Sequence, residues 1–484
     1  MKIVIIGLLV FLSVINTYGQ TWSHIDKVIA SDGGVEERFG YSVAISGDWA
    51  MVGAPYEDLS NEGAVYVFQF IGGMWIETQK LKPSTLYNDG FFGLSVDMDG
   101  GLAVIGALGD NGGGDNTGAA FVFELEDGTW VEKIKLMPSD PFPSDEFGAA
   151  VAVSGNSIIV GAQGKWGVGS YSGAAYVFKK IDGLWSETQK LTASDETIWD
   201  SFGNALDIQG DRILVAAYQN DIGASGSGSV YVFEFAGGTW VEQEILTASD
   251  PGEDDNFGSA VVLNNDRILV SARGDDNEYG TDAGAVYYFD KVDGDFVEEQ
   301  KIIVSDAETL TAFGTAISVS GNMAVIGSMG HTDYTSYIGA VNVYEYVDGL
   351  WVEGEKITAG TDTAAYDVFG TAVGLDNDRL IVGARGDDDN GDLSGSAYFF
   401  HRTYASVETV NTSLLVYPNP FNTEIVFDFD GECMYTLCNI YGQVLHQGKT
   451  YGKETLRSDE LVTGVYFLTI SRNDGDHVIK LMKN

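Results

Sequence analysis

Residues 147–191 read FGAAVAVSGNSIIVGAQGKWGVGSYSGAAYVFKKIDGLWSETQKL, a stretch that contains one complete repeat unit. Four short runs in it are rich in Val, Ile, Tyr and Phe, and their alternation of apolar and polar residues predicts four β-strands. Tight-turn residues separate the first strand from the second (Ser154-Gly155-Asn156) and the third from the fourth (Asp182-Gly183). Asp-Gly is typical of a type I′ hairpin, so neighbouring strands are expected to run antiparallel.

The same unit recurs along most of the chain, with intervals of 53, 55, 55, 55, 56 and 56 residues between successive Phe-Gly pairs. The first residues of these pairs are Phe39, Phe92, Phe147, Phe202, Phe257, Phe313 and Phe369. A constant period of this size indicates a propeller or a solenoid, and four-stranded antiparallel units favour a β-propeller. We therefore expect an all-β protein with seven four-stranded blades. Each Phe should be buried between adjacent blades, and each following Gly should allow close backbone approach or positive φ.

The two ends of the array are expected to close it into a ring. The last unit stops after its third strand, SAYFF, whereas a strand-like segment without a unit of its own, TWSHIDKVIA, occupies residues 21–30. Trp22 in this segment matches the Trp of other fourth strands, such as Trp75 and Trp130. The N-terminal strand is therefore predicted to complete the seventh blade, which leaves the array without an open end.

The units resemble FG-GAP repeats, the family of integrin α-subunit propellers and of many bacterial surface proteins. The resemblance covers residues 21–404 in seven in-register copies. Many family members place an Asp-rich calcium loop between the Phe-Gly and Gly-Ala-Pro motifs. Here that gap is closed by tight turns such as Ser46-Gly47-Asp48, and Gly-Ala-Pro is intact only at residues 53–55. This departure argues against that calcium site in every blade.

The charge balance excludes one large class of partners. Asp and Glu number 71 against 26 Lys and Arg, which gives a formal net charge of −45. Nucleic-acid binding requires clustered basic residues, so nucleic acid is not an expected partner. In antiparallel blades the tight turns share one face and the long loops share the other. The acidic long loops are therefore expected on a single face, where binding residues commonly lie.

Carboxylates on these loops are candidate ligands for calcium, the one cofactor that the sequence suggests, because Ca²⁺ takes six to eight oxygen ligands. The candidates are Asp387, Asp388, Asp389 and Asp392, with Asp275 and Asp276 as a second set. The alternative is solvated acidity without a metal. A recurring Ser-Asp pair after the fourth strand, as in Ser139-Asp140, is interpreted as turn capping.

Asp275 and Asp387 also end two Arg-Gly-Asp triplets, residues 273–275 and 385–387. This triplet is known as a ligand of adhesion receptors. Both copies occupy the same slot of the unit, directly after the Gly-Ala position, where the first unit carries Pro55. We therefore interpret the triplet as a variant of a repeated loop rather than as an adhesion signal.

The first 19 residues are predicted to form a signal peptide. Lys2 precedes a short apolar run, residues 3–15, and the small residues Thr17 and Gly19 indicate cleavage before Gln20. The run is too short to cross a bilayer of about 30 Å as a helix, and no later segment is long and apolar enough. The mature chain is therefore expected to be soluble and exported.

The propeller is expected to span residues 20–403, followed by a linker (404–412) and a small β-sandwich (413–484) with alternating strands. The tail contains YPNPF, IYGQVL and LVTGVYFLTI, whose motif residues are Tyr417, Pro418, Asn419, Pro420, Gly442, Gly464 and Tyr466. These motifs resemble the type A C-terminal sorting domain of the type IX secretion system of Bacteroidetes. The resemblance implies the type IX machinery as a partner, removal of the domain, and release from the cell or attachment to its surface.

No catalytic motif stands out. The five histidines form no metal-ligand pair at helical or hairpin spacing, and neither a nucleophile elbow nor a phosphate-binding loop appears. A carboxylate pair for glycoside cleavage stays open, because spacing in three dimensions is not visible in a sequence. The leading hypothesis is a secreted or cell-surface binding protein, not an enzyme, whose acidic long-loop face binds a glycan or a protein. The alternatives are a structural surface component and a polysaccharide-degrading enzyme, for which Lys165 and Trp166 are the nearest candidate residues.

Overall fold

The computed structural model describes residues 20–404 and 415–483, apart from residues 59, 86, 331–336, 363, 418–420, 422, 429–431, 440–442, 458–460 and 473–474. The chain divides into two compact units, one formed by Thr21–Arg402 and one that contains Thr403–Asn484. Within the described ranges every regular element is a β-strand. The same ranges contain no helix that is long and apolar enough to cross a membrane.

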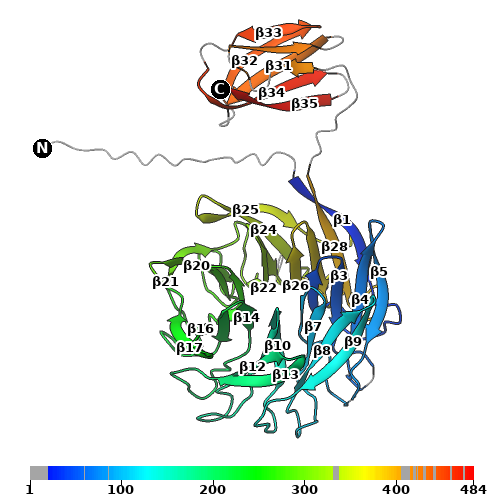
Figure 1. Ribbon diagram of the computed structural model, residues 1–484, viewed down its shortest axis with the longest axis vertical. Coiled ribbons are helices and arrows are strands. Elements are labelled where there is room, and N and C mark those ends of the chain that lie inside the picture. Colours follow the sequence, from blue (N-terminus) through cyan, green and yellow to red (C-terminus); the bar gives the residue numbers. More distant parts are fainter. Residues whose placement is uncertain are drawn as a thin grey trace, which may run out of the picture. The chain divides into compact units, whose positions relative to one another are not determined.

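In the first unit, the described strands form seven four-stranded antiparallel sheets arranged around a centre (Figure 1). The first strands are β2 (Ser42–Ser46), β6 (Val96–Asp99), β10 (Phe147–Ser154), β14 (Leu206–Gln209), β18 (Phe257–Asn264), β22 (Phe313–Ser320) and β26 (Phe369–Asp376). The second strands are β3 (Trp49–Ala54), β7 (Leu102–Ala107), β11 (Ser157–Ala162), β15 (Arg212–Ala217), β19 (Arg267–Ala272), β23 (Met323–Ser328) and β27 (Arg379–Ala384).

The third strands are β4 (Ala64–Ile71), β8 (Ala119–Glu126), β12 (Ala174–Ile181), β16 (Ser229–Ala236), β20 (Ala285–Val292), β24 (Ala340–Val347) and β28 (Ser396–Tyr404). The fourth strands are β5 (Met74–Leu81), β9 (Thr129–Leu136), β13 (Leu184–Leu191), β17 (Thr239–Leu246), β21 (Asp295–Ile302), β25 (Leu350–Ile357) and β1 (Gln20–Val28). The seventh sheet has the order β1-β28-β27-β26, so the N-terminal strand completes it as predicted. The seven-bladed propeller is confirmed, and we number the blades 1 to 7 from β2 onward.

The Phe-Gly pairs form the seams between blades. All seven Phe side chains are fully buried. Phe147 of blade 3 illustrates the arrangement: its backbone makes a parallel bridge to Gly118 of blade 2, and its ring lies 5.6 Å from that of Tyr176. Burial of such a ring is worth roughly 1.5–3 kcal/mol, so the repeated Phe explains much of the attachment of one blade to the next.

Two glycines of each seam meet where a side chain would not fit. Gly203, which follows Phe202, has a φ of +93°, and its carbonyl oxygen would lie 2.0 Å from a Cβ placed on Gly161 of the preceding blade. The Gly-Ala and Phe-Gly motifs therefore contact each other across the blade boundary, as the sequence predicts. Where the former glycine is replaced, the residue is small: Ala216 in blade 4 and Ser271 in blade 5.

The hairpins between third and fourth strands have the predicted type I′ geometry. Both central residues carry positive φ, for example 50° and 82° at Asp127-Gly128 and 51° and 83° at Asp182-Gly183. This geometry matches the twist of the flanking strands and keeps these connections to two residues.

The second unit contains two antiparallel sheets, which confirms the predicted β-sandwich class. One sheet has the order β29 (Leu415–Tyr417), β30 (Glu424–Asp428), β33 (Glu454–Arg457). The other has the order β32 (Val444–Tyr451), β31 (Glu432–Asn439), β34 (Gly464–Arg472), β35 (Gly475–Lys483). Its core includes Phe421, Phe427, Leu437 and Leu468, which come from both sheets and their connections.

Candidate functional site on the long-loop face

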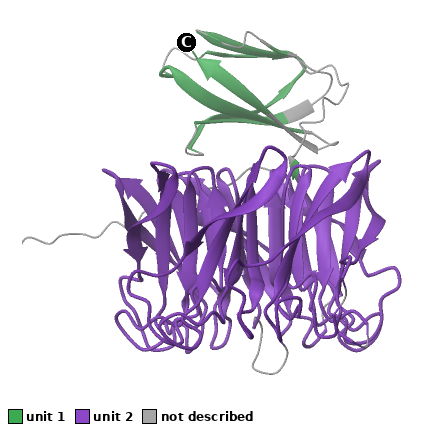
Figure 2. Ribbon diagram, turned by 60° about the horizontal axis from the view of Figure 1, so that its bottom comes forward, with its two compact units in different colours: residues 1–20, 403–484 green, residues 21–402 purple. Residues whose placement is uncertain are grey.

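The two faces of the propeller differ in their connections. Tight turns join the first to the second and the third to the fourth strands, whereas longer loops join the second to the third strands and each blade to the next. Figure 2 shows the longer loops gathered along the lower edge of the purple unit, opposite the tight turns. We call the surface formed by the longer loops the long-loop face and the other surface the tight-turn face. This confirms the expected segregation of the connections.

A group of polar side chains fixes the long-loop face of each blade, and blade 5 shows it most completely. Lys301 of β21 donates to Asp275 at 2.7 Å and to Asp250 at 2.8 Å. The hydroxyl of Tyr287 in β20 lies within hydrogen-bonding distance of the same two carboxylates, at 2.8 and 2.7 Å, and shares its one proton between them. Asp250 lies in the loop that enters the blade and Asp275 lies in the loop between the second and third strands. The group therefore ties the interblade loop to the blade that follows it, and we call it the interblade polar cluster.

The Ser-Asp pairs belong to these clusters, so their interpretation as turn caps is wrong. Ser139 donates to Glu187 in β13 of the next blade, at 2.7 Å through its hydroxyl and 2.8 Å through its backbone N–H. Asp140 accepts bonds from Tyr176 and Lys190 of that blade. The signal was present in the sequence as a Tyr and a Lys that recur at fixed distances after the Asp, but it spans a blade boundary.

Blade 7 carries the group of carboxylates that best fits a cation. Asp362, Asp387 and Asp389 offer oxygen atoms that all lie within 4.8 Å of one another. The ammonium of Lys27, from β1, lies among them at 2.6, 2.7 and 2.6 Å respectively. Burial opposes the charge of Lys27, but its hydrogen bonds to the three carboxylates outweigh that effect and raise its pKa above the ordinary value. The hydrogen bond from Lys27 lowers the pKa of Asp362.

The candidate calcium ligands therefore lie in different surroundings. Asp387 and Asp389 are paired with Lys27, and Asp275 is paired with Lys301. Asp388 and Asp392 are exposed, and a carboxylate oxygen of Asp276 accepts the backbone N–H of Asp282 at 2.9 Å. Three of the six carboxylates thus already have a cationic partner supplied by the chain, and calcium binding stays a prediction.

The Arg-Gly-Asp triplets present little of the acid to a partner. Asp275 is only 1% exposed, and Asp387 is also buried. Arg273 is exposed, whereas Arg385 lies over the ring of Tyr41 at 5.0 Å. The acid of each triplet serves the interblade polar cluster of its own blade, which supports its interpretation as a variant of a repeated loop.

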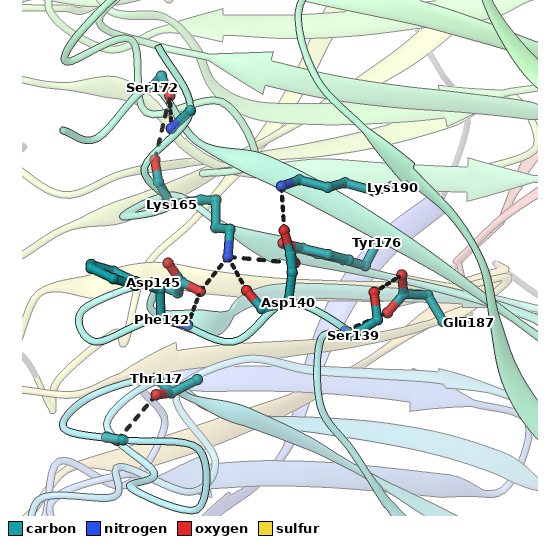
Figure 3. A network of polar contacts seen from close by, with 12 residues as sticks. Thr117, Ser139, Asp140, Phe142, Asp145, Lys165, Ser172, Tyr176, Glu187 and Lys190 are labelled. Atoms are coloured by element: carbon teal, nitrogen blue, oxygen red, sulfur yellow. Dashed lines mark hydrogen bonds and ion pairs between the residues drawn. The ribbon is translucent and has the colours of Figure 1, made fainter. Parts of the chain in front are cut away.

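Blade 3 has a lysine where blade 5 has Asp275. Figure 3 shows the Lys165 side chain reaching toward the loop that carries Asp140 and Asp145, where its ammonium donates to the Asp145 carboxylate at 2.8 Å and to the carbonyl oxygen of Asp140. Burial raises the pKa of the Asp145 carboxyl, although Lys165 opposes this effect. Lys165 is buried and fully paired. Trp166, the neighbouring candidate, is instead 53% exposed on the long-loop face.

The tight-turn face has a hollow of about 460 Å³ between blades 4 and 5. Arg212 lines it, and its guanidinium already bonds to Glu234, to Asp266 and to the carbonyl oxygen of Asn265. Because its charged groups are paired with each other, this hollow is a weaker candidate than the long-loop face.

The residues of the predicted sorting and cleavage motifs are only partly within the described chain. Gly19, Pro418, Asn419, Pro420 and Gly442 lie outside the described residues. The structure describes the remaining motif residues: Gln20 at the start of β1, Tyr417 at the end of β29, Gly464 at the start of β34, and Tyr466 within β34. The Tyr466 side chain is buried, and its hydroxyl donates to the carbonyl oxygen of Val462 at 2.6 Å.

Comparison with known families identifies both units. The protein-family model described as FG-GAP repeat matches residues 22–68, 75–123, 130–178, 185–233, 240–289, 296–344 and 351–400. The model described as secretion system C-terminal sorting domain matches residues 415–484. Among curated proteins no sequence matches the chain. The sorting domain indicates export through the type IX machinery to the cell surface or the medium.

Proposed function

Because this chain belongs to the FG-GAP repeat family, we propose that it is an exported binding protein whose long-loop face holds a glycan or a protein ligand. The observation that carries the proposal is the segregation of the connections. The described parts of the interblade loops and of the loops between second and third strands lie on one face, where the interblade polar clusters hold them in place. Loops positioned by a rigid scaffold are the usual location of binding residues.

The path of the chain supports this choice of face. The chain leaves the propeller after β28, a third strand, and third strands end on the tight-turn face. The connection to the sorting domain therefore starts opposite the long-loop face. A propeller attached through its C-terminal side would keep the long-loop face available for a ligand.

The near-equivalence of the blades favours binding over catalysis. Lys165, the residue with the clearest catalytic potential in the sequence, donates to Asp145 and Asp140 in the buried part of its loop. The acids of the other clusters are similarly engaged, for example Asp275 with Lys301. Charges that satisfy each other stabilise loops, and they are poorly placed for transferring protons to a substrate.

The test uses the chain from Gln20 onward on arrays of polysaccharides and matrix proteins, with retention and release of soluble fragments measured together. Retention without fragments is expected. Fragment release would contradict the proposal and favour a polysaccharide-degrading enzyme. Absence of both signals would favour a structural surface component.

A matched pair of labelled variants then locates the binding face. Glu278→Cys places a bulky maleimide label on the long-loop face, and Asn156→Cys places it in a tight turn on the other face. Both variants carry Ala at positions 433 and 438 to remove the native thiols. We expect the label at position 278 to weaken retention more than the label at position 156, and the reverse result would contradict the choice of face.

A further inference from the structure

Two residues with a left-handed backbone face each other at every blade junction on the long-loop face. The first, at the end of the loop between second and third strands, is Asn61, Asn116, Tyr171, Gly226, Asp282, Tyr337 or Leu393. The second, in the following interblade loop, is Asp89, Ser144, Trp199, Asp254, Leu310, Tyr366 or Glu36. Backbone hydrogen bonds hold the two loops together, as between the N–H of Asp89 and the carbonyl oxygen of Ser60 at 2.7 Å. Neighbouring blades therefore place these two positions side by side.

At two junctions both residues are aromatic. Tyr171 of blade 3 and Trp199, which leads into blade 4, stack with ring centroids 5.0 Å apart and an angle of 10° between the rings. Tyr337 of blade 6 and Tyr366, which leads into blade 7, stack at 6.1 Å and 22°. At the junction between blades 1 and 2, by contrast, Asn61 donates to Asp89 at 2.8 Å.

The conformation of Trp199 is unfavourable for its own stability. Its φ is +71°, a region that Gly, Asn and Asp tolerate but that is strained for a bulky residue. The residue is also 57% exposed, so burial of the indole does not compensate for the strain. An exposed aromatic ring held in a strained conformation points to a role outside folding.

The Tyr171–Trp199 pair is part of a larger apolar surface. Trp166 lies beside Phe142, with ring centroids 5.8 Å apart, and both side chains are about half exposed. Val168 and Ile198, from the same loops as Trp166 and Trp199, are also exposed. The other units have polar residues where blade 3 has Trp166, namely Asp58, Asn111, Asp221, Asp276, Thr332 and Asp388. We use the name aromatic patch for the six apolar side chains Phe142, Trp166, Val168, Tyr171, Ile198 and Trp199.

The carboxylates around the aromatic patch are all hydrogen-bonded within the protein. Each carboxylate of the three loops that form it, residues 137–146, 163–173 and 192–205, already has a partner. The pairs are Asp140 with Lys190, Asp145 with Lys165, Glu146 with Gln163, Asp195 with Tyr231, Glu196 with the N–H of Val168, and Asp200 with Thr197. Lys165 and Lys190 neutralise only two of these six charges, and the other four acids accept bonds from uncharged donors, so the loops around the patch stay negative and disfavour an anionic ligand.

We propose that the aromatic patch binds a neutral glycan, with sugar rings stacked on Trp199 and Trp166, and that the Tyr337–Tyr366 pair forms a second stacking position. This deepens the proposed function and rests on it. The apolar C–H face of a pyranose matches an exposed aromatic plane, while its hydroxyls stay in water or bond to the loops. The formal charge of −45 disfavours polyanions, and a neutral chain avoids that repulsion.

The arrangement favours a chain-like ligand over a folded protein. A specific protein interface buries about 800 Å² on each partner in one continuous area. Here one aromatic pair lies at the junction of blades 3 and 4 and the other at the junction of blades 6 and 7. Blades with acidic loops come between these two junctions in the order of the ring. An extended polymer can occupy separate stacking positions with few contacts between them.

The test is native affinity electrophoresis of the chain from Gln20 onward in gels that contain a neutral β-glucan, xylan, mannan or starch, with alginate as the anionic comparison. We expect retention by at least one neutral polysaccharide and none by alginate. Trp199→Asn and Trp166→Ala should each weaken retention about tenfold, and Tyr366→Ala should weaken it less. Leu184→Ala, which removes an exposed side chain of the tight-turn face, is the matched control and should leave retention unchanged.

Two further readouts separate binding from folding. Asn suits the left-handed backbone at position 199, so the melting temperature of Trp199→Asn should not fall although its binding is lost. Trp166 and Trp199 are the exposed tryptophans among the nine of the chain, all of which are described. Acrylamide quenching of the native fluorescence should therefore decrease when the glycan binds.

The outcomes distinguish this inference from the proposed function. Glycan retention that survives both Trp substitutions, but is blocked by the label at position 278, would overturn the aromatic patch and keep the long-loop face. Binding of a matrix protein that Trp199→Asn abolishes, without glycan retention, would overturn the ligand class. Blockage only by the label at position 156 would overturn both.

Discussion

Blades 3 and 5 have the same strands and turns, yet their long loops use opposite chemistry. Blade 5 buries Asp275 against Lys301, whereas blade 3 buries Lys165 against Asp145. The exposed residue that follows in the same loop also differs between the two blades: it is Trp166 in blade 3 and Asp276 in blade 5. Each cluster pairs a lysine with a buried carboxylate, so the sign of an individual residue can change while the loop stays in place. The scaffold therefore leaves the exposed positions of each blade free to acquire a distinct ligand surface.

The largest expected effect comes from breaking the blade 3 pair. Lys165→Met leaves Asp145, which is fully buried, without its cation, and should cost about 3 kcal/mol of unfolding free energy. Lys165→Asp places the residue of blade 5 at this position, where Lys190 can pair with it as Lys301 does with Asp275. We expect this variant to lose about half as much. Calorimetric unfolding measures both, and a larger loss in the Asp variant would contradict the equivalence of the blades.

Removing the strand-four lysine should affect the two blades unequally. Lys301→Met deprives buried Asp275 of its cation and should cost about 2 kcal/mol. Lys190→Met should cost about 1 kcal/mol or less, because Asp140 is half exposed and Lys165 stays beside it. Denaturant unfolding of the two variants gives the comparison, and equal losses would mean that Lys165 does not substitute for the missing charge.

The pH dependence of blade 7 sharpens the contrast with blade 3. Burial, together with the charges of Asp387 and Asp388, raises the pKa of Asp367 from 3.8 to about 6. The folded chain therefore holds this proton more tightly than the unfolded chain, and the resulting stabilisation is present at low pH and lost as the pH rises through 6. Asp367→Asn removes the titration, so between pH 4.5 and 7.5 it should gain about 1–2 kcal/mol relative to the unmodified chain.

Asp145→Asn is the matched control for that experiment, because Asp145 occupies the same position in blade 3 but faces Lys165. This variant breaks a buried ion pair and should lose stability at pH 7.5. If Asp367→Asn and Asp145→Asn changed the unfolding free energy in the same direction at pH 7.5, the charge of the neighbouring residue would not determine how this carboxyl affects stability.

The fold could be predicted almost completely from the sequence, because a repeat reports the same information seven times. Phe-Gly spacing set the blade count, Asp-Gly pairs set the hairpins, and Trp22 identified the closing strand. Each signal is local in sequence and acts through backbone geometry or burial of one ring. Seven concordant copies leave little room for another topology.

The candidate site could be predicted only in outline. The acids of the long loops were found, but Asp275 and Asp387 are buried, and their partners are distant in sequence: Lys301 in one case and Lys27 in the other. A count of acidic residues does not distinguish such buried, paired carboxylates from charges exposed to water. The aromatic patch was missed for a related reason, because Tyr171 and Trp199 meet only through the backbone pairing of two blades.

The smallest expected effect is that of calcium. The Lys27 ammonium lies among Asp362, Asp387 and Asp389, at the position where a cation would otherwise be bound by these oxygens. Addition of calcium or a chelator should therefore shift the unfolding free energy of the unmodified chain by less than about 0.5 kcal/mol, which thermal unfolding in both buffers can measure. Lys27→Met leaves the three carboxylates together without a cation, and its stability should rise with calcium. A large calcium effect in the unmodified chain, or none in Lys27→Met, would show that this lysine does not take the place of a metal ion.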